Sequence, residues 1–371
     1  SLVGSEMCIR DRNIGLDLGF LNNRLNVSFD AYIRDTKDML MAGKTLPGVY
    51  GASSPRMNVA DLRTKGWEAS ITWGDSFTLA SKPFNYRIMA GIGDNTSKVT
   101  KYDNPNRTLT DPYEGQQLGE IWGYVVDGYF KTDEEARNYK VDQSFVNQMI
   151  NASALDNGLH AGDLKFVDLD GNNKIEQTTS ANDRKDMKVI GNSLPRYNYN
   201  FGISADWYGI DFSVLFQGIG KQNWYPGAET SMFWGPYSRP YASFIPSDFM
   251  SQVWSEENTD AYFPRPRGYV ALGSNRELAV VNTKYLQNLA YCRLKNLSIG
   301  YTLPDKWLSK IGFEKIRVYF SGENLLTFTK LHSDYIDPEQ ASASNSWKTS
   351  KSDANIYPWA KTYSFGVDIT F

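Results

Sequence analysis

The sequence lacks the features by which several common classes of protein are recognised. It has two cysteines, Cys8 and Cys292, in 371 residues. These are too few for a disulfide framework, and they do not form a CxxC pair. The formal net charge is −3, and without a basic excess we expect no nucleic acid as a partner. No run of about 18 apolar residues is present, so no transmembrane helix is predicted.

Aromatic residues, by contrast, are abundant, with 23 Tyr, 19 Phe and 10 Trp. Residues 361–371, KTYSFGVDITF, alternate without interruption between an apolar and a polar face, which is typical of a β-strand. In a transmembrane β-barrel such a strand turns large apolar groups to lipid and small polar groups to the lumen. A half-buried strand of a soluble sheet shows the same alternation, so this segment alone does not distinguish a transmembrane barrel from a soluble sheet.

Eight further segments show the same period of two. They are residues 13–20, 24–34, 66–73, 84–93, 196–207, 210–216, 285–303 and 316–323. The phase slips within 285–303, which predicts a β-bulge near Lys295 and Asn296. Within the polar segment 94–194 we expect one helix, Asp133 to Ile150, because acidic residues occupy its first turn.

The connections between these nine strands alternate between short and long. The long ones are residues 42–58, 94–194, 220–283 and 330–360. Short turns on one side and long loops on the other are typical of outer-membrane barrels. We therefore predict an all-β protein, an antiparallel transmembrane β-barrel with long extracellular loops.

Six segments, in this order, resemble the C-terminal half of SusC/RagA-type TonB-dependent outer-membrane transporters. They are YEGQQLGEIWGYVVDGYF (113–130), GDLKFVDLDGNNKI (162–175), IGNSLPRYNYNFG (190–202), YCRLKNLSIGYTLP (291–304), IRVYFSGENLLTFT (316–329) and YPWAKTYSFGVDITF (357–371). The resemblance runs from about residue 13 to residue 371.

The resemblance implies a barrel of about 22 strands with an N-terminal plug, of which this chain would be an open part of about nine strands. It implies a place in the cell outer membrane, contact with its lipid, and import of an oligosaccharide or peptide. It also implies a SusD-like surface lipoprotein and an inner-membrane TonB complex as partners. The plug, the TonB-contacting segment and the first barrel strands have no counterpart in the sequence.

The first twelve residues, SLVGSEMCIRDR, show no strand alternation and no initiator Met. They resemble a translated sequencing adapter, so residues 1–12 are set aside as a non-native leader. Residues 13–371 are then the C-terminal part of the barrel.

Two groups of side chains are candidates for contact with a substrate or a partner. The polar face of 196–207 would line the lumen, through Arg196, Asn198, Asn200 and Asp206. The long loop 220–283 carries aromatics that could stack on sugar rings or pack on a lipoprotein partner, namely Trp224, Tyr225, Trp234 and Tyr237. Mutual packing inside an ordered loop would explain the same aromatics.

Residues 168–175, DLDGNNKI, place oxygen ligands at positions 1, 3 and 5 of an EF-hand-like loop, namely Asp168, Asp170 and Asn172. Such alternation lets a tight loop wrap a hard cation, so Ca²⁺ is a candidate cofactor. Asn173 stands where the turn favours Gly, and Thr179 stands at the position of the closing acid. Asp183 resembles the family's closing acid displaced by an insertion. The alternative is a metal-free turn rich in Asp and Asn.

No catalytic motif accompanies these patterns. The two histidines, His160 and His332, both fall in expected loops, and 42 acids make chance pairs of carboxylates easy to find. We therefore expect a transporter and not an enzyme. The alternative is a soluble or surface-attached β-rich glycan-binding protein or glycoside hydrolase. The two hypotheses differ in whether the apolar face of the sheet is exposed or buried.

Overall fold

Nine strands form one antiparallel sheet in the computed structural model, which describes residues 7–43, 47–51, 55–147, 158–238, 245–266, 268–308, 312–341, 351–352 and 357–371. In spatial order they are β1 (Cys8–Phe20), β2 (Leu25–Ala42), β3 (Arg56–Leu79), β4 (Lys82–Lys101), β9 (Arg196–Trp207), β10 (Ile210–Lys221), β13 (Tyr291–Thr302), β14 (Lys315–Thr329) and β16 (Thr362–Thr370). Each pairs with the next of these strands along the chain, so the prediction of nine antiparallel strands is confirmed. Several continue past their predicted bounds, β3 at both ends.

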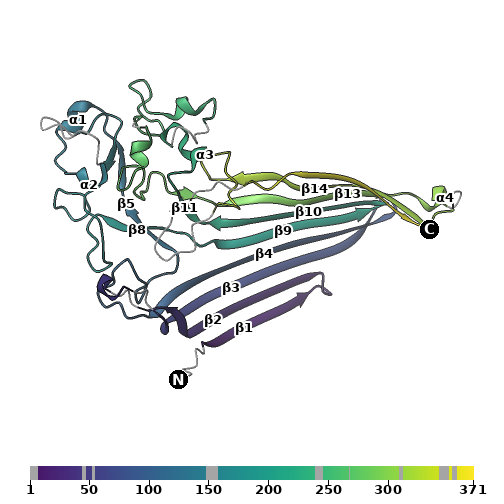
Figure 1. The fold of residues 1–371 in the computed structure, drawn as a ribbon. Coiled ribbons are helices and arrows are strands. Elements are labelled where there is room, and N and C mark those ends of the chain that lie inside the picture. The colour runs from purple at the N-terminus through teal and green to yellow at the C-terminus, as the bar shows by residue number, and fades with distance from the viewer. Residues whose placement is uncertain are drawn as a thin grey trace.

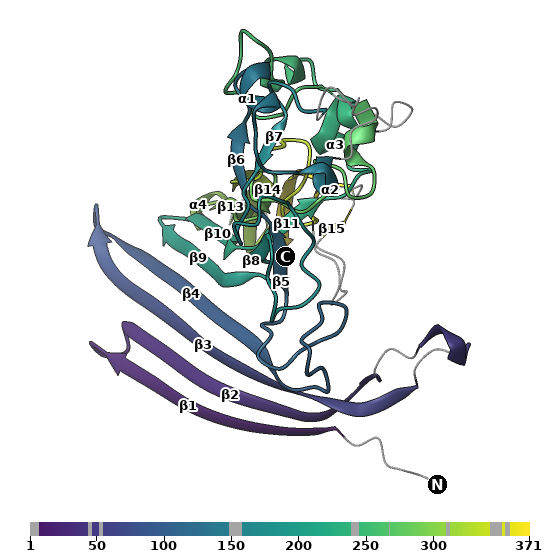
Figure 2. The same cartoon turned by 90° about the vertical axis from the view of Figure 1, so that its left-hand side faces the viewer.

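The sheet is curved and open (Figures 1 and 2). Strands β1 and β16 lie at its two edges, and neither has a second partner strand among the described residues. A closed barrel leaves no such edge. The prediction of an open part of a barrel is therefore confirmed.

The first strand begins earlier than predicted. β1 starts at Cys8, and residues 8–12 pair in register with residues 33–37 of β2. Backbone pairing of this kind does not depend on apolar alternation, and it is accompanied by an ion pair in which Arg34 Nε lies 2.9 Å from Asp11 Oδ1. Residues 8–12 therefore form part of the sheet, and the prediction that the first strand begins at residue 13 is wrong. Residues 1–6 lie outside the described part of the chain.

Short turns gather at one end of the sheet and long connections at the other (Figure 1). Ala80 and Ser81, with φ of 47° and 61°, join β3 to β4, and Tyr208 and Gly209, with φ of 50° and 81°, join β9 to β10. Two left-handed residues in a two-residue loop match the twist of the strands they connect. The predicted alternation of short and long connections is present in the structure.

The two faces of the sheet carry the predicted alternation. Large apolar side chains on one face are exposed. They include Ile14, Leu16, Phe29, Ile71, Ile88, Ile203, Ile299, Val318 and Phe365. Phe365 is 83% exposed, for example, and Ile203 is 43% exposed. A sheet that buried this face in a core would cover these groups. The arrangement is that of a barrel wall facing lipid.

A hydrophobic core forms instead among the three longest connections, 94–194, 220–283 and 330–360, which we call the first, second and third connections. We call this part the loop lobe, residues 102–195, 222–290 and 330–341. Its core includes Phe166 from the first connection, Trp234 from the second and Ile336 from the third, all at most 5% exposed. Because one core draws on all three connections, they fold together and not as separate loops.

Short elements organise the loop lobe. β5 (Glu120–Tyr124) pairs with β8 (Met187–Asn192), β6 (Val126–Tyr129) with β7 (Leu164–Phe166), and β11 (Asn223–Pro226) with β12 (Gln287–Asn288) and β15 (Lys351–Ser352). The α-helices of the described residues are α1 (Asp133–Arg137), α2 (Ser144–Asn147), α3 (Ser231–Trp234) and, in the β13–β14 turn, α4 (Asp305–Leu308). Among the described residues, none of these helices is long and apolar enough to span a membrane.

The single helix predicted over Asp133 to Ile150 is wrong. Thr132 Oγ1 caps α1 by accepting a hydrogen bond from Glu135 N at 3.1 Å, so the start is as expected. The helix ends at Arg137, and α2 is a separate turn. Tyr139 turns away between them and donates to Phe166 O at 2.9 Å, a tertiary contact that outweighs local helix propensity. Residues 148–150 lie outside the described residues.

Candidate functional site

The polar face of the sheet forms a continuous wall. Asn200 lies in one cross-strand row with Gly91 of β4, Gln217 of β10, Arg293 of β13 and Thr327 of β14. In antiparallel pairs the residues directly opposite share a face. The row therefore shows that β4, β9, β10, β13 and β14 present small and hydrogen-bonding groups to the same side.

Three of the four predicted lumenal residues lie on this wall. Asn198 and Asn200 are exposed, and Asp206 Oδ2 accepts a hydrogen bond from Asn85 Nδ2 at 2.8 Å. Arg196 differs, because Tyr197 adopts a left-handed φ of 56° that interrupts the regular strand. The Arg196 guanidinium is bound to Asp94, with Nε 2.6 Å from Oδ1. Arg196 thus fastens β9 to β4.

The four predicted aromatics of the second connection lie in the interior of the loop lobe. Trp224, Tyr225, Trp234 and Tyr237 are all at most 1% exposed and belong to the core of the loop lobe. The Trp234 ring centroid lies 5.3 Å from that of Tyr285, edge to face. Their buried polar groups form hydrogen bonds within the lobe; Trp234 Nε1, for example, donates to Gly227 O at 3.0 Å. Their burial supports the alternative explanation of these aromatics, mutual packing within the lobe, over contact with a substrate or a lipoprotein.

The aspartate loop is built as a tight turn. Asp168 accepts hydrogen bonds from Gly171 N and Asn173 N, both at 2.7 Å. Asn173 has a left-handed φ of 60°, a conformation that Asn tolerates better than other non-glycine residues. The departure from Gly at this position therefore does not disturb the turn.

The acid that closes this loop in space is Asp186 and not Asp183. Carboxylate oxygens of Asp168, Asp170 and Asp186 lie within 4.8 Å of one another, whereas Asp183 lies outside this group. Asp186 is fully buried and accepts from Leu169 N at 2.9 Å and Glu176 N at 2.7 Å. Burial raises the pKa of its carboxyl, and Asp170 and Asp168 raise it further.

Hard carboxylate oxygens at this separation fit a calcium ion. Ligand oxygens on opposite sides of one Ca²⁺ are about 5 Å apart, since each bond is about 2.3–2.6 Å. The set would consist of Asp168, Asp170 and Asp186, which would hold the ion at the edge of the loop lobe. Its effect there would be structural, balancing the three acidic groups.

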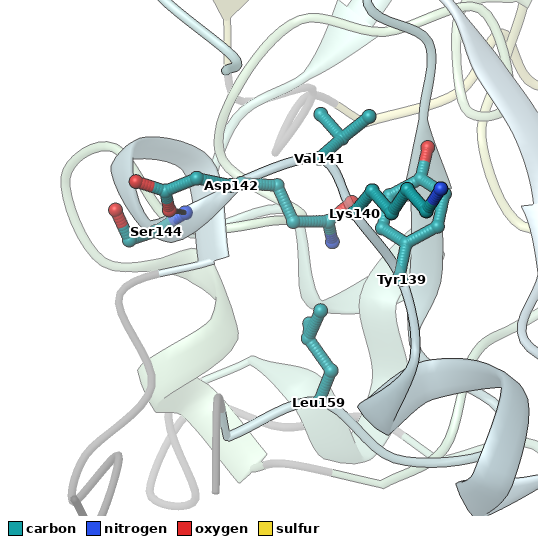
Figure 3. A pocket seen from close by; sticks show the side chains of 7 residues that line it. Tyr139, Lys140, Val141, Asp142, Ser144 and Leu159 are labelled. Carbon is teal, nitrogen blue, oxygen red and sulfur yellow. Dashed lines mark hydrogen bonds between the residues drawn. The ribbon is translucent and has the colours of Figure 1, made fainter. Parts of the chain in front are cut away.

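One hollow of about 250 Å³ lies between α1 and α2 in the loop lobe (Figure 3). Its lining includes Tyr139, Gln143 and Leu159. The Tyr139 hydroxyl donates to Phe166 O, and Gln143 Nε2 donates to Leu164 O at 2.8 Å. These polar ends hold the lobe's own backbone, so we assign the hollow no ligand.

Fold and wall together define a class of protein: an open segment of a transmembrane-type β-barrel with one polar face and a folded lobe built from its long connections. No protein-family model matches the chain. It is 28% identical to TonB-dependent receptor P3 of Formosa agariphila and 23% identical to TonB-dependent receptor SusC of Bacteroides thetaiotaomicron. Both alignments cover 97% of this chain, but 34% and 31% of those proteins respectively. The chain therefore spans about one third of the length of these curated relatives.

Solved structures show the same fold. The RagAB peptide importer in its open-open state matches with a TM-score of 0.69 at 22% identity, covering 98% of this chain and 34% of that chain. The closed-closed state gives 0.68 at 23% identity, covering 98% and 35%. The resemblance to the C-terminal part of SusC/RagA-type TonB-dependent outer-membrane transporters is thus confirmed. The named relatives are receptors and an importer and not enzymes, in agreement with the prediction of a transporter.

Proposed function

We propose that this chain forms part of an outer-membrane importer that takes up oligomeric nutrients, either glycans or peptides, in a TonB-dependent process. A SusD-like surface lipoprotein would cover the loop lobe, and the inner-membrane TonB complex would act through parts of the transporter outside this chain. The chemistry is capture and passage, with no bond made or broken.

The observation that carries this proposal is the inverted burial of the sheet. Its apolar face is exposed, as at Ile203 and Phe365, and its opposite face presents residues such as Asn198 and Asn200. A soluble glycan-binding protein or hydrolase would bury the apolar face. Amides and carboxylates along the polar face suit the many hydrogen-bonding groups of a glycan or a peptide.

The test uses the full-length transporter in cells that otherwise lack it. Asn200→Trp places a bulky ring on the lumenal face, and uptake of oligosaccharide or peptide pools should fall several-fold. Phe201→Trp, the neighbouring position on the exposed apolar face, is the matched control and should leave uptake unchanged. Equal uptake by both variants would contradict passage along this wall. The pool that supports growth of the parent strain identifies the chemical class of the cargo.

A further inference from the structure

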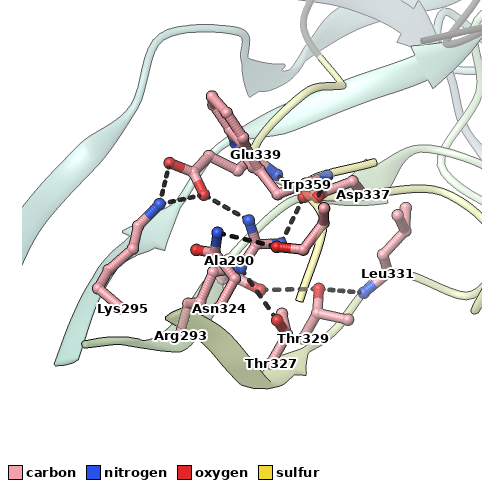
Figure 4. Close-up of polar contacts among 11 residues, drawn as sticks. Ala290, Arg293, Lys295, Asn324, Thr327, Thr329, Leu331, Asp337, Glu339 and Trp359 are labelled. Carbon is pink, nitrogen blue, oxygen red and sulfur yellow. Dashed lines mark hydrogen bonds and ion pairs between the residues drawn. The ribbon is translucent and has the colours of Figure 1, made fainter. Parts of the chain in front are cut away.

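A cluster of charged side chains joins the third connection to the barrel wall (Figure 4). Arg293 Nη2 lies 2.6 Å from Asp337 Oδ1, and Arg293 Nη1 lies 2.6 Å from Glu339 Oε2. The side chains of Arg293 and Asp337 are only 4% and 3% exposed. Lys295 Nζ completes the cluster at 2.7 Å from Glu339 Oε1. Two cations thus meet two carboxylates, and the cluster is electrically balanced.

The position of this charged cluster depends on an irregularity that β13 and β14 share. In their pairing the register passes from Leu294 opposite Leu326 to Asn296 opposite Glu323. Lys295 thus stands opposite two residues of β14, Asn324 and Leu325. Against β10, Leu294 pairs with Phe216 and Asn296 with Leu215, so in that pairing Lys295 is an extra residue of β13, as the sequence predicted. The irregularity in β14 includes Asn324, whose φ of 54° is left-handed. Bulges redirect side chains near functional sites.

Both arms of the third connection are held at this point. Asp337 belongs to the arm that leaves β14, and its Oδ2 accepts a hydrogen bond from Trp359 N at 2.9 Å, in the arm that returns to β16. Asn324 Nδ2 donates to Ala360 O at 3.2 Å on the returning arm. Lys295 Nζ lies 5.6 Å from the Trp359 ring centroid, within cation–π range.

The charged cluster faces the lumen. Arg293 stands opposite Gln217, which stands opposite Asn200 in the polar row described above. Its Nε also donates to Thr327 Oγ1 at 3.0 Å in that row. The carboxylates that bind Arg293 therefore approach from the lumenal side of the wall.

We propose that Arg293, Lys295 and Asn324 form a clamp that holds residues 331–341 and 357–360 against the lumenal wall at the level of Asn200. The two arms then act as a fixed inner lining of the conduit mouth, and rearrangements that admit cargo take place elsewhere. The inference rests on the proposed import function for its meaning, but the clamp itself is testable without any cargo.

Hydrogen–deuterium exchange of the purified full-length transporter in detergent tests the clamp. Asp337→Asn removes the charge that binds Arg293 while keeping the size of the side chain. Exchange in peptides covering 331–341 and 357–361 should become about tenfold faster or more, because their protection depends on this carboxylate. Asp35→Asn is the matched control, since it breaks the Arg63–Asp35 pair, also 2.6 Å long, on other strands. It should leave both peptides unchanged.

Unchanged exchange in a folded Asp337→Asn transporter would overturn the clamp, and so would equal acceleration by Asp35→Asn. If the Asp337→Asn variant does not fold, the Asn324→Gly variant provides the test of the clamp. Glycine keeps the left-handed backbone and removes only the amide that binds Ala360, so faster exchange confined to 357–361 supports the clamp and no change overturns it. Import by the parent transporter is measured separately, so failure of the clamp is distinct from failure of the import function.

Discussion

Two residues of β9, three positions apart, show what a side chain experiences on each face of the sheet. Ile203 is on the apolar face and 43% exposed, whereas Asn200 lies on the polar face opposite Gly91 and Gln217. The same substitution at the two positions therefore meets two different solvents. A charge on the lipid face must leave water, but a charge on the lumenal face can remain hydrated.

We expect Ile203→Arg to destabilise the full-length transporter by about 2–4 kcal/mol, the cost of a cation near the bilayer midplane. Asn200→Arg should cost much less stability and should alter uptake instead. The stability of both variants is measured by unfolding in denaturant, followed through heat-modifiable migration on gels. Equal destabilisation by the two variants would argue against lipid on the Ile203 side.

Tyrosines on the polar face lie over glycines of the neighbouring strand. Gly66 of β3 stands opposite Tyr32 of β2, and a Cβ at Gly66 would overlap the Tyr32 ring. Gly366 and Tyr319 repeat this arrangement between β16 and β14. An aromatic ring placed over a strand glycine covers backbone that would otherwise lack a side-chain contact.

Gly66→Ala should therefore destabilise the sheet by about 1–3 kcal/mol, because the added methyl must displace the Tyr32 ring. Gly74→Ala is the control in the same strand, since its Cβ would meet nothing closer than the Tyr86 carbonyl oxygen at 3.8 Å. The measurement is the denaturant midpoint of each full-length variant. A similar midpoint for the two would show that the ring moves aside at no cost.

At the scale of elements, period-two alternation located all nine strands because it is a local property of each strand. Their ends were less predictable: β3 runs from Arg56 to Leu79, beyond the predicted 66–73, since pairing with β2 and β4 continues where alternation stops. The bulge at Lys295 could be predicted from the phase slip in the sequence. The matching irregularity of β14 at Asn324 could not, nor could the binding of Asp337 and Glu339 to Arg293 and Lys295. The contacts of Asp337 and Glu339 with β13 join residues 44 to 46 positions apart.

The candidate site was predictable to a smaller extent. Asp168, Asp170 and Asn172 could be read from their spacing, but Asp186 reaches the loop through backbone contacts to Leu169 and Glu176. The aromatics of the second connection have the same composition whether they bind a ligand or form a core. Only their burial in the structure separates the two.

Calcium should stabilise the aspartate loop if Asp168, Asp170 and Asp186 hold it. Removing Ca²⁺ from the full-length transporter with a chelator should speed proteolysis near Gly171 several-fold, and adding Ca²⁺ should restore protection. Asp186→Asn should reduce the response to chelator, whereas Asp183→Asn should not. Cleavage at the same rate with and without chelator would leave the metal-free turn as the description of this loop.

At the scale of the whole molecule, the loop lobe and the sheet differ in what holds them together. The lobe has its own core, which includes Phe166, Trp234 and Ile336. The sheet has an apolar face that needs lipid and a polar face that needs water. Its β1 and β16 edges each present a row of backbone groups with no partner strand among the described residues. In hydrocarbon, each unpaired N–H or C=O costs several kcal/mol.

This chain expressed alone should therefore not insert as a conducting barrel. Its nine strands leave two edges, near Cys8–Phe20 and Thr362–Thr370, that hydrocarbon does not tolerate. We expect aggregation or degradation of the isolated chain, no heat-modifiable band, and no single-channel current in a planar bilayer. The full-length transporter, prepared in the same way, should show the band. Discrete currents from the isolated chain would mean that β1 and β16 pair with each other, and that the open sheet is not how this chain behaves in lipid.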